Sequence, residues 1–226
     1  MTLSIAHRGE PLGHLENTLP AFQAAISAGA DMVELDVRLA ADGVPVLLHD
    51  ATLRRIWGRG VSLSDVTSSE LAALRGPAEE YVPTLAEAAD LIAGAGRQIM
   101  VDLPEPAAIP AAHTVLERAG VMDACLFAGR SRWMRREMPA ARIALSWDGV
   151  RPPDSVTLEY FRPEYFNPHF RLLTAGIADA MHARGIGVSV WTVDHPRDMA
   201  AVITQGADAV ITNRIADLVA ISRATA

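Results

Sequence analysis

Short runs of aliphatic and β-branched residues alternate along the whole chain with alanine-rich segments of helical periodicity. Eight of the runs have the length and composition of buried strands. They are residues 3–9, 32–37, 98–103, 124–129, 142–147, 164–168, 188–193 and 208–212. Helical patterns fill most of the intervals, at residues 18–29, 84–96, 111–120, 131–139, 174–185, 196–206 and 214–224. This alternation is typical of a parallel sheet built from βα units.

One βα unit is partly repeated, which favours a closed ring of such units. "FQAAISAGADMVE" near the start resembles "MAAVITQGADAVI" near the end, and each contains a helix, a glycine turn and a strand. Eight successive units predict an α/β fold, a single-domain (β/α)8 TIM barrel over residues 1–226. A doubly wound open sheet is the alternative, which we disfavour because no glycine-rich nucleotide loop follows the first strand.

An additional extended segment, "VPVLLHD", follows the second strand. Asp42-Gly43 in front of it is a strong signal for a two-residue hairpin turn, so we expect the segment to fold back along the strand. With that turn, Asp36 faces His49. The hairpin and residues 51–82 are therefore predicted to form an insertion after strand 2, at the carboxyl end of the barrel.

Composition and charge narrow the possible partners and location. The net charge is −7 and the 20 basic residues, all arginine, form no basic block, so we expect no nucleic-acid partner. A single cysteine excludes an internal disulfide framework. The N-terminal residues lack the pattern of a signal peptide, and no apolar run approaches the ~18 residues of a transmembrane segment. We expect a soluble cytoplasmic protein that acts on a small molecule.

Polar residues gather where the predicted strands end, which is where barrel enzymes carry their active sites. Glu34 and Asp36 lie two residues apart and so point to one face, and Asp102 ends the next barrel strand. A divalent cation, Mg²⁺ or Ca²⁺, would offset the repulsion among these carboxylates and prefers such oxygen ligands. The alternative is that Glu34 and Asp36 pair with arginines such as Arg8 and Arg38.

His7 and His49 are predicted to flank this carboxylate cluster. Two imidazoles, one accepting and one donating a proton, suit the cleavage of a phosphoester. Arg8 is placed to hold a phosphate oxygen by a charge-assisted hydrogen bond. Other polar residues at predicted strand ends are Ser146, Asp148, Asn167, Trp191 and Thr192.

Four motifs in a fixed order extend over most of the chain: "AHRG" with "ENT", "GADMVELDVRLAADGVPVLLHDATLRR", "VPTLAEAADLI" and "GIGVSVWTVD…GADAVITNR". With them the sequence resembles the glycerophosphodiester phosphodiesterases. The resemblance implies a TIM barrel and metal-dependent hydrolysis of a glycerophosphodiester to sn-glycerol 3-phosphate and an alcohol. The substrate's own 2-hydroxyl attacks phosphorus in the implied mechanism, and water then opens the cyclic phosphate. The implied roles are acid–base catalysis for His7 and His49, metal binding for Glu34 and Asp36, phosphate binding for Arg8 and a pocket wall for Trp191.

The third strand departs from the family pattern. The family usually has Glu-x-Lys there, with the glutamate on the metal and the lysine on the phosphate, whereas this chain has "VDLPEP". Asp102 takes the glutamate position and keeps the ligand oxygens, with a reach shorter by one methylene. Pro104 takes the lysine position, and Arg130 after the fourth strand is a candidate replacement. Asn213 stands where the family often has Asp, and we expect it to form hydrogen bonds at the barrel rim.

Two alternative functions are open, the first of them because Pro104 replaces the lysine. One is a phosphodiester-binding pseudoenzyme, and the other is a different metal-assisted barrel chemistry, such as a lyase acting on a phosphorylated metabolite or a phospholipase-D-like cyclising enzyme. A Schiff-base aldolase is excluded, because the chain has no lysine to form the imine.

Overall fold

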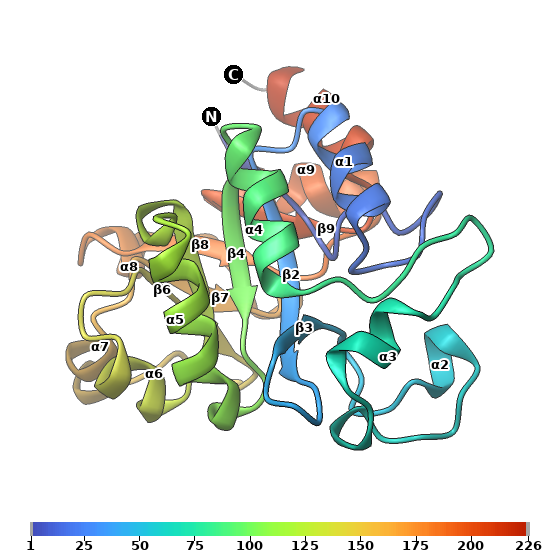
Figure 1. The fold of residues 1–226 in the computed structure, drawn as a ribbon. Helices are drawn as coiled ribbons and strands as arrows, with labels where there is room; N and C mark the ends of the chain where they lie inside the picture. Colours follow the sequence, from blue (N-terminus) through green and yellow to red (C-terminus); the bar gives the residue numbers. More distant parts are fainter. Residues whose placement is uncertain (1, 225–226) are drawn as a thin grey trace.

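A computed structural model of the chain describes residues 2–224, which form a barrel of parallel strands surrounded by helices (Figure 1). The strands are β1 (Leu3–Ala6), β2 (Met32–Leu39), β3 (Pro45–Leu47), β4 (Gln98–Asp102), β5 (Cys125–Gly129), β6 (Ile143–Trp147), β7 (Tyr165–Pro168), β8 (Gly187–Val190) and β9 (Ala209–Thr212). The helices are α1 (Leu19–Ser27), α2 (Arg54–Trp57), α3 (Ser68–Ala72), α4 (Leu85–Gly94), α5 (Ile109–Arg118), α6 (Arg132–Glu137), α7 (Ser155–Phe161), α8 (Ala175–His182), α9 (Pro196–Thr204) and α10 (Ile215–Ala224). Short 3₁₀ turns are η1 (Leu63–Asp65), η2 (Pro106–Ala108), η3 (Met122–Ala124) and η4 (Phe170–Leu172).

The parallel strands close into a ring. Strand β1 pairs with β9 on one side and with β2 on the other, and β8, β7, β6, β5 and β4 complete the circle. Strand β3 lies outside the ring and pairs antiparallel with β2. Because every barrel strand has two parallel neighbours, the structure confirms the TIM barrel and excludes the open sheet.

The repeated sequence unit has the same structural purpose in both copies. Gly29 and Gly206 have φ of +92° and +97°, and each allows the chain to turn from a helix toward the next strand. The aspartate two residues later then binds the start of a neighbouring strand. Asp31 accepts a hydrogen bond from a backbone N–H of β1 at 2.8 Å, and Asp208 accepts one from β8 at 2.7 Å.

The core has two apolar layers, one between the barrel and its helices and one inside the barrel. The inner layer contains Ile5, Met32, Met100, Leu126, Ala128, Ala144, Ala209 and Ile211. Three of these side chains, Met100, Ala128 and Ile211, also line the cavity at the carboxyl end of the strands. The inner core is therefore the floor of the candidate site, and its packing keeps that floor rigid.

The hairpin of β2 and β3 is present, but its predicted register is wrong by one residue. Asp36 lies opposite Leu48, whose N–H donates to the Asp36 carbonyl at 3.1 Å, and not opposite His49. The expected two-residue turn needs a positive φ at both central residues. Gly43 has one, +76°, whereas Asp42 does not. The chain instead forms a loop one residue longer, closed by the left-handed glycine.

Residues 51–82 form the expected insertion, and α2 and α3 lie beside the hairpin at the carboxyl end of the strands (Figure 1). The insertion and the hairpin share a small apolar core of their own. It contains Ala40, Val46, Leu48, Leu53, Leu63, Leu71, Leu74 and Val82. Within residues 2–224, no helix is long and apolar enough to cross a bilayer.

Candidate active site

A cavity of about 570 Å³ opens at the carboxyl end of the barrel strands. All seven candidate site residues from the sequence line it, namely His7, Arg8, Glu34, Asp36, His49, Asp102 and Trp191. The other polar strand-end residues, Ser146, Asp148, Asn167 and Thr192, line it as well. The parallel barrel brings these side chains together because all of its strands end at the same rim.

Three carboxylates form the acidic part of the cavity. Glu34 and Asp36 project from β2, and Asp36 lies in register with Asp102 of β4. One oxygen of each carboxylate lies within 4.8 Å of the others, and Glu34 and Asp36 are only 5% and 1% exposed. Burial, and then the neighbouring carboxylates, raise the pKa of Glu34 well above its usual range. The same causes raise the pKa of Asp102 to about 6. Buried oxygen donors that repel one another fit a divalent cation.

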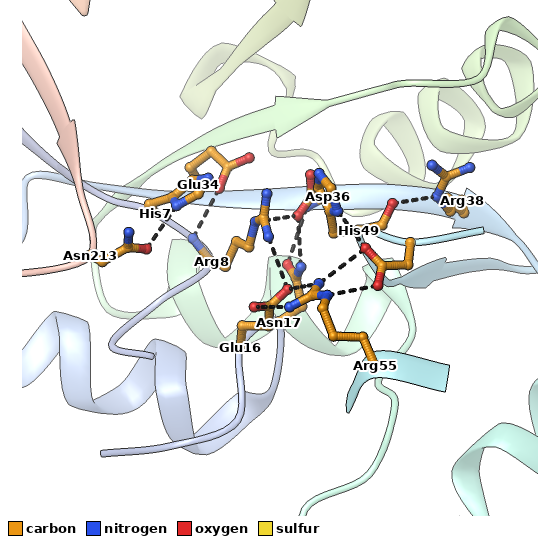
Figure 2. A network of polar contacts seen from close by, with 11 residues as sticks. His7, Arg8, Glu16, Asn17, Glu34, Asp36, Arg38, His49, Arg55 and Asn213 are labelled. Carbon is orange, nitrogen blue, oxygen red and sulfur yellow. Dashed lines mark hydrogen bonds and ion pairs between the residues drawn. The ribbon is translucent and has the colours of Figure 1, made fainter. Parts of the chain in front are cut away.

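The turn after β1 neutralises part of this acidic charge (Figure 2). The backbone N–H of Arg8 donates to Glu34 at 2.9 Å, and its guanidinium Nε lies 3.0 Å from Asp36 Oδ2. Asn17 donates to the same oxygen of Asp36 at 2.8 Å. Arg8 and Asn17 have φ of +59° and +57°, which few residues other than glycine adopt. These contacts stabilise a strained turn that places His7 beside the carboxylates.

His7 is held in a defined tautomer. Its Nδ1 lies 2.8 Å from Asn213 Oδ1, and Asn213 uses its Nδ2 to donate to Asp194 at 2.8 Å. The amide oxygen of Asn213 therefore faces the imidazole, so Nδ1 of His7 donates and Nε2 keeps its lone pair. Burial, followed by the charge of Arg8, lowers the pKa of His7, which favours the neutral, proton-accepting ring at neutral pH.

His49 is held on the opposite side of the cluster by a carboxylate. Its Nδ1 lies 2.7 Å from Asp50 Oδ1, and its backbone carbonyl accepts from Arg38 Nε at 2.7 Å. Arg38 also pairs with Glu105. Hydrogen bonds from Arg55 lower the pKa of Asp50 to about 2, so this partner is an ionised acceptor. Nδ1 of His49 is therefore the donor, as in His7.

The alternative pairing of the carboxylates with arginines holds only in part. Arg8 contacts Asp36, but Arg38 contacts neither Glu34 nor Asp36 among the contacts of the described chain. Within residues 2–224, neither Glu34 nor Asp102 is therefore paired with an arginine side chain, and their carboxylate oxygens can still bind a cation.

Arginine, tryptophan and proline side chains also line the cavity. Trp191 donates its indole N–H to the backbone carbonyl of Asn167 at 2.9 Å, which fixes the ring against the cavity. Arg130 lies at the rim with its side chain 58% exposed, and it pairs with Asp148 at 2.7 Å. Pro104 lines the cavity on the adjacent strand. Asp102 of β4 is in register with Ala128 of β5. Pro104 and Arg130 each follow two residues later along the chain, beyond the ends of these strands.

Comparison with known proteins identifies the family. The model of the glycerophosphoryl diester phosphodiesterase family matches residues 7–217. The chain belongs to this family. It is 28% identical over 233 residues to the glycerophosphodiester phosphodiesterase of Caldanaerobacter subterraneus subsp. tengcongensis, a match that covers 94% of each chain.

Solved structures of phosphodiesterases share the fold. A glycerophosphodiester phosphodiesterase from Thermotoga maritima has a TM-score of 0.84 and 27% identity, over 98% of this chain and 99% of the other. An Oleispira antarctica phosphodiesterase, solved in complex with the product sn-glycerol-3-phosphate, has a TM-score of 0.91 and 24% identity, over 99% and 97% of the two chains. These likenesses show that the chain has the same barrel fold as both of these proteins.

Five residues of the phosphodiesterase site received no chemical role from the sequence. They are Glu16, Asn17, Asp50, Arg55 and Asn213, all of which hold another site residue. For Asp50 a signal existed, because a carboxylate directly after a rim histidine is well placed to orient it. Asn213 was expected at the rim, and it is there, but its contact with His7 joins strands at opposite ends of the sequence.

Proposed function

We propose that this phosphodiesterase hydrolyses a glycerophosphodiester to sn-glycerol 3-phosphate and an alcohol, with His7 and His49 as its acid–base pair. One observation supports this more than any other. The two imidazoles line one cavity and lie on opposite sides of the buried Glu34 and Asp36 (Figure 2), and each has its Nδ1 held as a donor. Each ring is thereby left with Nε2 as its proton-exchanging atom, so one ring can accept a proton while the other donates one in general acid–base catalysis.

His7 is the better candidate for the proton acceptor of the first step. Its lowered pKa favours the neutral ring, so Nε2 can accept the proton of the attacking glycerol hydroxyl. His49 then donates a proton to the leaving alcohol oxygen as the P–O bond breaks. In the second step water opens the cyclic phosphate, His49 accepts the proton of water, and His7 returns its proton to the glycerol oxygen.

Glu34, Asp36 and Asp102 are the residues that would hold a divalent cation, Mg²⁺ or Ca²⁺. Their oxygens fit either ion, since both prefer carboxylate ligands. A bound cation would polarise the phosphoryl oxygens and offset their growing negative charge. The raised pKa values of Glu34 and Asp102 support this assignment, because a site that disfavours bare carboxylates favours a cation among them.

Arg8, Arg130 and Trp191 are proposed to bind the substrate. The guanidinium of Arg8 is fixed between Asp36 and Glu16, so it can orient a phosphate oxygen but cannot move far toward it. Arg130 is more exposed, and its single ion pair with Asp148 is weak enough in solvent to be exchanged for a phosphate. Trp191 supplies an apolar wall for the glycerol or the alcohol. We also propose that the partner is a small molecule and that the reaction takes place in the cytoplasm.

The test is turnover of glycerophosphocholine and related diesters by the wild type, His7→Ala and His49→Ala. We expect glycerol 3-phosphate from the wild type with Mg²⁺ or Ca²⁺, and loss of most turnover in both variants. The matched control is His113→Ala on α5, outside the cavity, which should keep wild-type turnover. A cyclic phosphate that persists in the phosphorus NMR spectrum would indicate the cyclising alternative. Binding of the diester without turnover would indicate the pseudoenzyme.

A further inference from the structure

Arg55 of α2 forms hydrogen bonds with two carboxylates at the rim of the candidate active site, Asp50 and Glu16 (Figure 2). Its guanidinium binds Asp50 at 2.7 Å from Nε and 3.1 Å from Nη2. The same guanidinium binds Glu16 at 2.9 Å from Nη1 and 2.7 Å from Nη2. Two carboxylates are thus each held by a pair of hydrogen bonds, a geometry that the planar fork of arginine provides and an ammonium does not.

Each carboxylate held by Arg55 also contacts a residue of the proposed reaction. Asp50 Oδ1 accepts from Nδ1 of His49 at 2.7 Å, and Glu16 Oε1 accepts from Nη1 of Arg8 at 3.0 Å. Arg8 follows β1, whereas His49 follows β3, so these two groups lie on separate segments of the chain. The chain Arg8–Glu16–Arg55–Asp50–His49, which we call the Arg55 bridge, links the two segments across the rim of the barrel.

The two carboxylates of the Arg55 bridge are held in their ionised state. Hydrogen bonds with Arg55 lower the pKa of Asp50 to about 2. Against the effect of burial, the bonds from Arg55 and the charge of Arg8 also lower the pKa of Glu16. Both carboxylates therefore stay ionised acceptors throughout the neutral range, and Asp50 keeps the Nδ1 proton on His49.

We propose that Arg55 is a positioning residue for the phosphodiesterase reaction, which sets His49 and Arg8 relative to each other through Asp50 and Glu16. The insertion after β3 thereby acquires a function, because it delivers this guanidinium to the rim. The inference rests on the proposed function for its effect on turnover, but the hydrogen-bond geometry of His49 can be measured without a substrate.

Removal of the Arg55 guanidinium should change the orientation of His49 and Arg8 more than it changes the free energy of unfolding. Arg55 is 44% exposed, and ion pairs in contact with solvent contribute little to the free energy of unfolding. The insertion also keeps its own apolar core, in which Leu53, next to α2, is buried. The variants are therefore expected to fold, which circular dichroism and thermal denaturation would verify.

The experiment compares Arg55→Gln and Arg55→Lys with Arg54→Gln. Arg54 lies on the same turn of helix, is exposed and takes no part in the bridge, so its substitution removes the same charge. We expect kcat of Arg55→Gln to fall about 10- to 100-fold with little change in KM, the usual effect of losing an orienting partner. Arg55→Lys should recover part of kcat, and Arg54→Gln should match the wild type.

A double substitution tests whether Arg55 acts through Asp50. If it does, Arg55→Gln combined with Asp50→Asn should lower kcat little further than Asp50→Asn alone. If the two residues act independently, the fold-losses in kcat of the two single variants should multiply in the double variant. Should Arg55→Gln fail to fold, the same kcat comparison is made between Arg55→Lys, Asp50→Asn and the variant that combines them.

The nitrogen-15 shifts of the His49 ring give a readout that needs no turnover. They should report a single Nδ1–H tautomer in the wild type and in Arg54→Gln, and a mixture in Arg55→Gln. Turnover and a His49 tautomer in Arg55→Gln that both equal those of Arg54→Gln would overturn the inference. A wild type that cleaves no glycerophosphodiester but shows the tautomer change would overturn the proposed function and leave the Arg55 bridge supported.

Discussion

Replacing Asp102 by asparagine would separate the electrostatic cost of the carboxylate cluster from its proposed use as a metal site. The substitution keeps the shape of the side chain and removes one of three crowded charges. Burial, and then the charge of Asp36, raise the pKa of Asp102 from an ordinary 3.8 to about 6. At about 1.4 kcal/mol for each pKa unit, the ionised Asp102 costs the folded chain about 3 kcal/mol at pH 8 in EDTA. That corresponds to roughly 6–12 °C in Tm for a chain of this length.

The sign of the effect follows from proton linkage. A carboxyl with a higher pKa in the folded chain than in the unfolded chain binds its proton more tightly when folded. The stabilisation by that proton is fully present below pH about 4, and it is lost as the pH rises through about 6. In EDTA, Asp102→Asn should therefore match the wild type near pH 4 and exceed it in free energy of unfolding by up to about 3 kcal/mol at pH 8.

Urea unfolding is followed by circular dichroism at several pH values, with EDTA or with a divalent cation. The EDTA series measures the electrostatic cost of Asp102, and the cation series measures its contribution to metal binding. With Mg²⁺ or Ca²⁺ the order should reverse at pH 8, since the cation stabilises the folded wild type and the variant lacks one ligand. The control is Asp90→Asn on the exposed face of α4, which should stay within about 0.5 kcal/mol of the wild type. If Asp102→Asn were the less stable protein at pH 8 in EDTA, the reasoning about its pKa would be refuted.

Four further substitutions test other parts of the site and the turn beside it. Asn213→Ala should lower kcat about 10- to 100-fold in steady-state assays, because the His7 ring loses the acceptor that orients it, and an unchanged kcat would remove that role. Arg130→Ala should lower kcat/KM by about 100-fold if its guanidinium binds the transferring phosphate, whereas Asp148→Asn, which frees Arg130 from its 2.7 Å ion pair, should not lower it. Equal kcat/KM in the wild type and Arg130→Ala would exclude Arg130 from the phosphate site. Gly9→Ala should destabilise the fold by about 1–3 kcal/mol, since its φ is +88° and a Cβ would lie 2.7 Å from the backbone of α1. An unchanged Tm would contradict this account of the turn.

Periodicity was sufficient to predict the barrel, because its eight strands are short apolar runs separated by helices with clear glycine stops. The register of the hairpin could not be predicted in the same way. Asp42-Gly43 is compatible with a two-residue turn and with a longer loop, and the choice depends on the φ of Asp42. Asp42 accepts hydrogen bonds from the backbone and the hydroxyl of Ser68, at 3.2 and 2.7 Å. That tertiary contact, 26 residues away, is absent from any local pattern.

The residues facing the cavity could be predicted because parallel strands deliver their last side chains to one rim. Glu34, Asp36 and Asp102 were paired correctly by strand order alone, as the register of β2 and β4 confirms. Strand order could not identify the residues that hold these carboxylates or the two histidines in place. Arg55 acts from an insertion whose path across the rim follows from its own small core, and Asn213 reaches His7 only because the ring closes between β9 and β1.

The most direct test of the account is phosphorus NMR of glycerophosphocholine incubated with the protein. With Mg²⁺ or Ca²⁺, we predict that the diester signal is replaced by that of sn-glycerol 3-phosphate, and that EDTA or His49→Ala stops the conversion. A diester that stays intact with either cation, or a conversion that proceeds equally well after His49→Ala, would contradict the account.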